Sequence, residues 1–165
     1  MPVMAQTPTH QLKPTATPNT GWGLGFDLPG IGADYGVGMT ITTPTFYKDI
    51  LAIRMRYNRI NNHGSQYTLG LLGFDGMAGA VRLYGEGGFL MNYKTQNIDG
   101  VTAGIGIYAQ FGFEFFPASH NCYFIEMGII DHNGVVETPT GVDYFGGAFI
   151  SRVGFRYFFR KKERS

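Results

Sequence analysis

Ten charged side chains fall in segments where polar and apolar residues alternate, and their types indicate ion pairing. Five are carboxylates and five are arginines, with no lysine among them. Arginine pairs with carboxylates in buried sites through two parallel hydrogen bonds, whereas solvated surfaces favour lysine. Paired carboxylates can also do acid–base catalysis, but here each acid has an arginine in register. We therefore interpret the set as a structural ion-pair network. The ten residues are Asp27, Asp34, Arg54, Arg56, Arg82, Glu86, Glu114, Glu126, Arg152 and Arg156.

A second set of residues is of a type used in ester hydrolysis, where a serine nucleophile needs a histidine base and an acid beside it. Ser119 and His120 are adjacent in a predicted turn, Asp131 and His132 end a predicted strand, and Ser151 lies in the middle of another. His132 has no serine within two residues on its strand. The spacing therefore predicts no catalytic residues.

Metal and redox chemistry are weakly indicated. His10 lies near the start of the chain and His63 in a predicted loop, so the four histidines are scattered and predict neither a metal site nor a cofactor. Cys122 is the only cysteine, which excludes an intrachain disulfide. We expect Cys122 to be a small buried apolar residue at the start of a strand.

Composition excludes several other classes of protein. The 165 residues carry a net charge of +1, so no basic excess points to a nucleic-acid partner. Only 15% of the residues are charged, where soluble domains usually have about 25%. The 25 glycines are roughly twice the ordinary share. No apolar run approaches the roughly 18 residues of a membrane helix.

The elements that must position the charged residues are strands. Residues 101–116 read VTAGIGIYAQFGFEFF, with apolar residues alternating with polar residues or glycine until Phe116 breaks the pattern. A helix would mix the two classes on every face, so a period of two indicates a strand. Seven further segments alternate in the same way: 21–28, 31–42, 51–58, 66–71, 81–92, 123–130 and 149–157.

Residues typical of turns separate these eight segments. They are Pro29-Gly30, Thr43-Pro44-Thr45, 61–64, Asp75-Gly76, 97–100, 117–121 and a longer connection at 133–143. No proline is expected inside a strand, because a continuous hydrogen-bonded ladder excludes it. Long strands leave exposed edges unless the first strand pairs with the last. We therefore predict an all-β protein, an eight-stranded antiparallel up-and-down barrel that is closed.

The composition of the two faces indicates which one lies inside. The polar face carries arginine, glycine, threonine and tyrosine. The lysines instead fall in the predicted tails and connections, at Lys13, Lys48, Lys94, Lys161 and Lys162. A polar interior with an apolar exterior is typical of a transmembrane barrel, whereas a soluble barrel has the reverse arrangement. Eight strands enclose only enough room for side chains, so charges and tyrosines should fill the interior and leave no pore.

Aromatic residues gather where one end of the barrel is expected. In an up-and-down meander, the end of the sixth strand, the start of the seventh and the end of the eighth meet at one rim. Aromatic girdles at the membrane interface have this distribution. The residues are Phe111, Phe113, Phe115, Tyr123, Phe155, Tyr157 and Phe159.

Residues 21–159 resemble the small outer-membrane β-barrels of the OmpA and OmpX type. The resemblance rests on the stretch from Gly104 to Pro117, on 123–128 and on the closing VGFRYFF of 153–159. The last strand is similar to the aromatic-ended signal that the outer-membrane insertion machinery reads. The resemblance implies the cell outer membrane as the location, with outer-membrane lipid and that machinery as partners.

The chain is expected to have three regions. Residues 1–20 hold four of the eight prolines and predict a flexible extended leader. Val3, Met4 and Ala5 fit the pattern before a signal-peptidase cut, which would make this start the remnant of an export signal; a chance tripeptide is the alternative. The barrel covers 21–159, and a basic tail covers 160–165.

The function that follows is a structural, envelope-stabilising or surface-interaction role in the outer membrane, with a surface partner that the sequence does not identify. Three alternatives remain at this point: a soluble lipocalin-like ligand-binding barrel, an extracellular all-β assembly subunit, and a membrane-embedded lipid-modifying enzyme resembling lipid A deacylases. The deacylase pattern pairs a histidine with a nearby serine on one strand, and that pair is missing here.

An even number of strands places both termini on one side, which we assign to the periplasm. The connections at 93–100 and 133–143 should then face outward. The turns at Asp75-Gly76 and 117–121 should face the periplasm.

Overall fold

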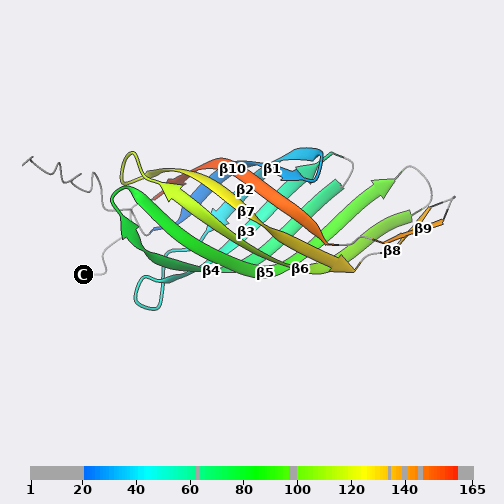
Figure 1. The fold of residues 1–165 in the computed structure, drawn as a ribbon, viewed down its shortest axis with the longest axis horizontal. Coiled ribbons are helices and arrows are strands. Elements are labelled where there is room, and N and C mark those ends of the chain that lie inside the picture. The colour runs from blue at the N-terminus through cyan, green and yellow to red at the C-terminus, as the bar shows by residue number, and fades with distance from the viewer. Residues whose placement is uncertain are drawn as a thin grey trace, which may run out of the picture.

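A computed structural model shows the chain as a closed antiparallel barrel with one additional hairpin (Figure 1). The structure describes residues 21–61, 64–96, 100–133, 135–138, 141–144 and 147–159. The predicted leader and basic tail lie outside these ranges. The barrel strands are β1 (Gly23–Ile31), β2 (Asp34–Thr42), β3 (Leu51–Ile60), β4 (Gly64–Ala78), β5 (Val81–Gln96), β6 (Gly100–Phe115), β7 (Asn121–Asn133) and β10 (Ala148–Phe158).

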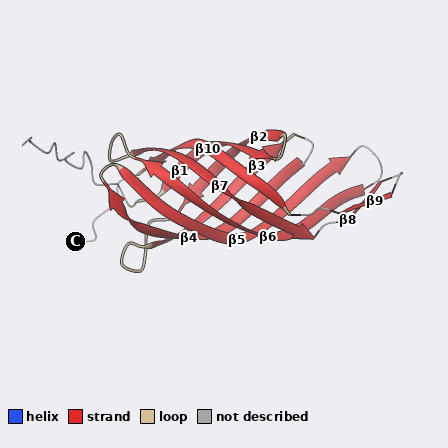
Figure 2. Ribbon diagram, in the orientation of Figure 1, coloured by secondary structure: helices blue, strands red, loops and turns tan. Residues whose placement is uncertain are grey.

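Each barrel strand pairs with the next along the chain, and β1 closes the barrel against β10. The closing pair runs in register from Gly23 opposite Phe158 to Ile31 opposite Ile150. The predicted eight-stranded closed barrel is therefore confirmed, and the described residues are strands, turns and loops (Figure 2). No helix in the described part of the chain is long and apolar enough to cross a membrane.

The connection between β7 and β10 contains structure that the alternation pattern missed. Two short strands, β8 (Val135–Thr138) and β9 (Gly141–Tyr144), pair as a separate hairpin. The hairpin lies at the end of the barrel opposite the start of β1 (Figure 1).

The prediction that no proline lies inside a strand is wrong. Pro29 is in β1, opposite Arg152 of β10, and the turn to β2 comes later, at Gly32 and Ala33. On its other side, the pairing of β1 with β2 is interrupted at Leu28 and Pro29 and resumes at Gly30. Proline has no N–H to donate, so it is tolerated where the ladder is already interrupted.

Two further connections differ from their predicted positions because β4, β5 and β6 are longer than the alternation indicated. Asp75 and Gly76 lie within β4, where the register shifts between Asp75 and Met77, and the chain turns at Gly79 and Ala80. The predicted 93–100 loop is strand at both ends, since β5 continues to Gln96 and β6 begins at Gly100. Lys94, expected in that loop, is in β5 opposite Thr102.

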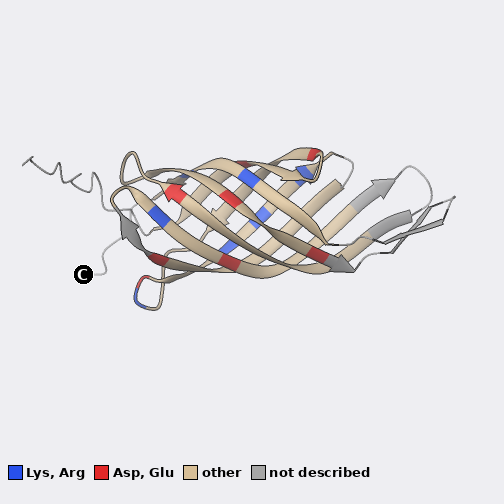
Figure 3. Ribbon diagram, viewed as in Figure 1, with Lys and Arg blue, Asp and Glu red and all other residues tan. Residues whose placement is uncertain are grey.

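Burial alternates along the barrel strands with the apolar side chains outside. Phe26 and Ile107 are 63% and 58% exposed, whereas Arg54 and Glu114 are fully buried. Charged residues from several strands lie along the barrel wall (Figure 3). The barrel therefore has its polar residues inside and its apolar residues outside.

Apolar side chains close the interior near both ends. One layer lies towards the β1–β2 and β3–β4 turns, and its members are Ile31, Ile60, Leu90, Tyr108, Ile130 and Ile150. The other lies at the 116–120 turn, and its members are Phe116, Cys122, Phe124 and Phe158. The charged residues between these layers are consequently shielded from water.

Candidate functional site

The candidate site is the charged interior, which holds nine of the ten predicted network residues. The five arginines and four of the carboxylates, Asp27, Glu86, Glu114 and Glu126, are buried. Asp34 is the exception, because it begins β2 at the end of the barrel and is only half-buried. Five buried arginines against four buried carboxylates leave the interior with a formal charge of +1.

Two arginines of β3 bridge two carboxylates at the centre of the interior. Arg54 Nη1 lies 2.8 Å from Glu86 Oε2 and 2.7 Å from Glu126 Oε1. Arg56 Nη2 lies 2.7 and 2.8 Å from the same two oxygens. Glu126 is on β7, four strands away from β3 around the barrel. These ion pairs therefore cross the interior and tie opposite walls together.

A second cluster forms around Glu114 of β6. Arg82 Nε donates to its Oε2 at 2.7 Å, and Arg156 Nη1 donates to its Oε1. Arg156 Nη2 also lies 3.6 Å from Glu126 Oε1. Arg156 thus stands between the two carboxylates of neighbouring strands, and Arg54 Nη2 approaches Glu114 at 3.6 Å.

The third cluster lies where the barrel closes. Asp27 of β1 faces Gly154 of β10 across the closing ladder, and its Oδ2 lies 3.5 Å from Arg152 Nε. Thr40 donates a hydrogen bond to Asp27 Oδ1 at 3.3 Å, and Arg152 also donates to Gln110. Strands at the two ends of the sequence are therefore joined by side chains as well as by the ladder.

Neutral residues that the sequence analysis did not single out complete the network. Tyr84 donates its hydroxyl hydrogen to Glu126, and Tyr108 donates to Glu86 Oε1 at 2.7 Å. Gln110 Nε2 donates to both carboxylates, at 2.9 Å to Glu86 and 3.1 Å to Glu126. All three lie on the polar face of the alternating pattern, so the strand register was the signal that could have identified them.

Inward-facing glycines make room for these side chains. A Cβ built at Gly112 would lie 2.6 Å from both Cζ and Oη of Tyr84. The Tyr84 ring cannot easily give way, because the Arg54 guanidinium carbon lies 4.9 Å from its centroid and its hydroxyl binds Glu126. At Gly70 a Cβ would meet Tyr108 Oη at 2.1 Å. The space left by glycine is thus taken by tyrosine as well as by arginine.

Gly112→Ala is expected to destabilise the barrel by about 1–3 kcal/mol, the usual cost of overpacking an interior. The matched control is Gly85→Ala, since a Cβ at Gly85 meets nothing within 4 Å. That change should be neutral or stabilising by up to about 1 kcal/mol. Urea unfolding in lipid vesicles measures both variants, and a Gly112→Ala midpoint at or above that of Gly85→Ala would contradict the packing described here.

The seven predicted girdle residues all lie on the outer wall around one rim. Phe115, Tyr123 and Phe155 stand opposite one another across β6, β7 and β10. The Tyr123 and Phe155 ring centroids are 5.5 Å apart, and those of Tyr157 and Phe159 are 5.3 Å apart. The structure therefore gathers these side chains into one aromatic band.

The residues considered for ester hydrolysis are not assembled into one site. His120, with its neighbour Ser119, is at the girdle end, where its Nδ1 lies 2.9 Å from the Phe158 carbonyl oxygen. Asp131 is near the other end of β7, and Ser151 faces outward from β10. The side chain of His132 and all of His10 and His63 lie outside the described parts. Among the described residues, no group of three or more His, Cys, Asp or Glu could hold a metal ion.

Comparisons with known proteins give matches in structure but not in sequence. No protein family and no curated protein matches the chain. The crystal structure of the N-terminal β-barrel domain of Pseudomonas aeruginosa OprF is similar with a TM-score of 0.63 at 15% identity, covering 87% of this chain and 100% of that one. The outer-membrane protein OprG from Pseudomonas aeruginosa is similar with a TM-score of 0.58 at 13% identity, covering 87% of this chain and 99% of that one.

The likeness is one of fold. The chain has the closed eight-stranded antiparallel barrel of these outer-membrane proteins, which confirms the predicted fold class and the resemblance to small outer-membrane barrels.

Proposed function

We propose that this chain is an integral protein of the cell outer membrane with a structural, envelope-stabilising or surface-interaction role. The observation that carries the proposal is the inverted barrel. Large apolar side chains such as Phe26 and Phe89 are more than 60% exposed, while five arginines and four carboxylates are buried inside. Exposing such a band to water would be unfavourable, whereas lipid covers it at no cost. A soluble lipocalin-like barrel would need the opposite arrangement.

The interior supports a filled barrel and not a channel. Charge pairs cross it between β3 and β7, and apolar layers lie above and below them. Ions would have to displace paired and buried charges, which is costly. The ion pairs are therefore proposed to hold the wall rigid, so that the barrel serves as an anchor for the connections at its ends.

A lipid-modifying activity is less well supported. Ester hydrolysis needs a nucleophile within hydrogen-bond reach of its base. His120 instead stacks on Tyr157, which is six residues along β10 from Ser151. We propose that the protein is not an enzyme.

Fractionation and gel mobility test the proposed location. The expressed protein should be recovered with outer membranes, should require detergent for extraction, and should migrate differently on a denaturing gel before and after boiling. Release of folded protein by buffer alone would contradict a membrane-embedded barrel.

The proposed topology places the girdle end in the periplasm and the β8–β9 hairpin outside. A cleavage sequence for a specific protease inserted after Pro139, between β8 and β9, should be cut when the protease is added to intact cells. The same sequence inserted after Ser119, in the turn between β6 and β7, should be cut only after the cells are opened. Cleavage of the second insertion alone in intact cells would invert the orientation.

A further inference from the structure

The outer wall formed by β3, β4 and β5 arranges its exposed side chains in three rows across the strands. Arg59, Ser65 and Tyr93 form the row nearest the β3–β4 turn. Tyr57, Tyr67 and Met91 form the second row. The third row is Met55, Leu69 and Phe89. Successive rows are two residues apart along each strand, or about 7 Å, so polarity falls from a cation to hydroxyls to purely apolar groups over about 14 Å.

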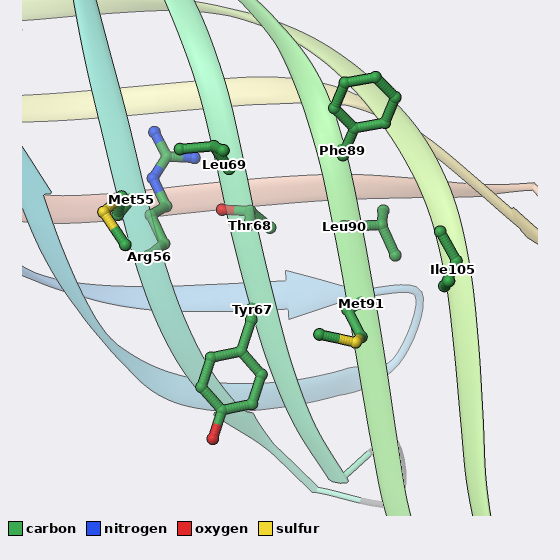
Figure 4. Close-up of a pocket in the computed structure, with 9 residues that line it drawn as sticks. All are labelled: Met55, Arg56, Tyr67, Thr68, Leu69, Phe89, Leu90, Met91 and Ile105. Carbon is green, nitrogen blue, oxygen red and sulfur yellow. The ribbon is translucent and has the colours of Figure 1, made fainter.

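Residues of the second and third rows line an apolar groove with a volume of about 330 Å³. Its outward-facing lining residues are Met55, Tyr67, Leu69, Phe89, Met91 and Ile105. In the close-up, Phe89 and Leu69 lie at one end of the groove and Tyr67 at the other (Figure 4). The groove is therefore open to the surroundings of the barrel, and the inward-facing Arg56, Thr68 and Leu90 also line it.

Arg59 is an unusual residue for this surface. The described strands contain six arginines; the other five are buried, and Arg59 is exposed. Its Nη1 donates to Ser65 Oγ at 3.1 Å, and no carboxylate of the described residues lies within 4 Å of its guanidinium. A guanidinium with free donors at the edge of an apolar surface is suited to binding a phosphate.

Aromatic hydroxyls lie between the cation and the groove. The ring centroids of Tyr57 and Tyr67 are 5.1 Å apart, and those of Tyr67 and Tyr93 are 6.2 Å apart. The Tyr57 hydroxyl is 3.4 Å from Ser65 Oγ, the atom that also accepts from Arg59. Tyrosine favours the boundary between hydrocarbon and headgroups, which indicates that this row lies at the level of lipid ester groups.

We propose that this wall is a binding site for one phosphate-bearing anionic lipid. The phosphate binds Arg59 and Ser65, the tyrosine hydroxyls face the ester region, and an acyl chain occupies the groove. The proposal rests on the outer-membrane function proposed above, and adds a defined ligand to the lipid surface. Charge complementarity favours a lipid over a second copy of the barrel, because the cation and the apolar groove are arranged in the order of a headgroup and its chain.

Quenching of a tryptophan by brominated lipid acyl chains tests the site in the full-length protein. Trp22 is the only tryptophan, so the Trp22→Phe variant has no tryptophan fluorescence and a single reporter can be added to it. A reporter at Ile107→Trp lies next to Phe89 in the third row. The matched reporter Val153→Trp is on β10, four strands from β4 around the barrel. Each protein is folded into phosphatidylcholine vesicles containing brominated phosphatidylglycerol or brominated phosphatidylcholine.

The Ile107→Trp reporter is expected to show a preference of about fivefold for the anionic lipid, since one cation at the membrane surface contributes roughly that factor. Arg59→Gln should reduce the preference to about one, and Arg59→Lys should retain most of it. The Val153→Trp reporter should show no preference in any background.

Four results would overturn the proposal. Equal quenching by both lipids at Ile107→Trp, or a preference that survives Arg59→Gln, leaves the outer-membrane barrel intact but removes the lipid site. Weak quenching by both lipids at Ile107→Trp, with normal quenching at Val153→Trp, shows that another protein surface covers the groove. Absence of quenching at both positions contradicts membrane insertion itself, and with it both proposals.

Discussion

Arg54→Met is expected to lower the free energy of unfolding by about 3–5 kcal/mol, the cost of breaking a buried ion pair by removing one partner. Methionine keeps much of the length of the side chain but leaves the carboxylates without one of their cations. Glu86 and Glu126 lose contacts of 2.8 and 2.7 Å, and Arg56 becomes the cation that both must share. Water cannot compensate for the loss, because Arg54 and both carboxylates are almost fully buried.

Equilibrium unfolding by urea in lipid vesicles measures this loss, and Arg59→Met is the matched control. The control makes the same chemical change on the same strand, but at an exposed side chain whose described contact is the hydroxyl of Ser65. Exposed polar contacts of this kind contribute about 0–1 kcal/mol. Equal midpoints for the two variants would contradict the buried charge network.

A double variant distinguishes the free-energy cost of an unpaired buried charge from the cost of lost packing. Arg54→Met combined with Glu126→Gln removes one cation and one anion of the same cluster. It should be less destabilising than the two single changes added together, because neither change then leaves an unpaired buried charge. Strict additivity would indicate that Arg54 stabilises the barrel mainly through packing.

The local part of this network could be predicted from the sequence because short turns fix the register of a meander. Closure of the barrel pairs the first strand with the last, which predicts Asp27 near Arg152 and Arg156, and Arg152 Nε lies 3.5 Å from Asp27 Oδ2. Glu114 and Glu126 come from strands joined by the 117–121 turn, which predicts a shared cation from the next strand, and Arg156 contacts both. These are contacts between neighbouring strands, where alternation and turn position are sufficient information.

Contacts across the interior could not be predicted in the same way. The pairing of Arg54 and Arg56 with Glu126 joins walls that are four strands apart. Such a contact depends on the width of the barrel and on side-chain rotamers, which no alternation pattern contains. The sequence therefore identified nine charged members of the network but neither its neutral members, Tyr84, Tyr108 and Gln110, nor its central connections.

The ends of the strands were the least predictable part of the fold. Ile130 falls on the polar side of the alternating pattern, and Ile60 and Ile150 share the parity of that side in their strands, yet all three face inward in the apolar layer that closes one end. Phe116 interrupted the alternation for the same reason at the other end, since it packs inside with Phe124 and Phe158. Excluding water from the interior requires apolar residues there, so the pattern fails where the barrel is sealed.

Ile107→Arg is expected to destabilise the barrel by about 2–4 kcal/mol in lipid, the cost of an arginine on the lipid face at the bilayer midplane. Ile107 is 58% exposed near the middle of β6, on the same outer face as Phe115 in the girdle and Ala103 towards the other end. With a rise of about 3.3 Å per residue and a tilt near 40°, Phe115 and Ala103 are about 30 Å apart along the membrane normal. Ile107 is therefore about 10 Å from Ala103 and about 20 Å from Phe115 along the normal, which places it inside the apolar band and about 5 Å from its centre.

Ala103→Arg is the matched control for depth. Ala103 is opposite Tyr93, at the next position along the row that contains Arg59, and so lies towards the same end of the barrel wall. An arginine there can reach water and phosphate, and should cost about 0–1 kcal/mol. Unfolding in vesicles compares the two variants on one strand and one face, where they differ in depth and in the exposed Asp131 of β7, which lies opposite Ile107. If both substitutions are tolerated equally, lipid does not surround this wall, and the apolar exterior of the barrel must be covered in some other way.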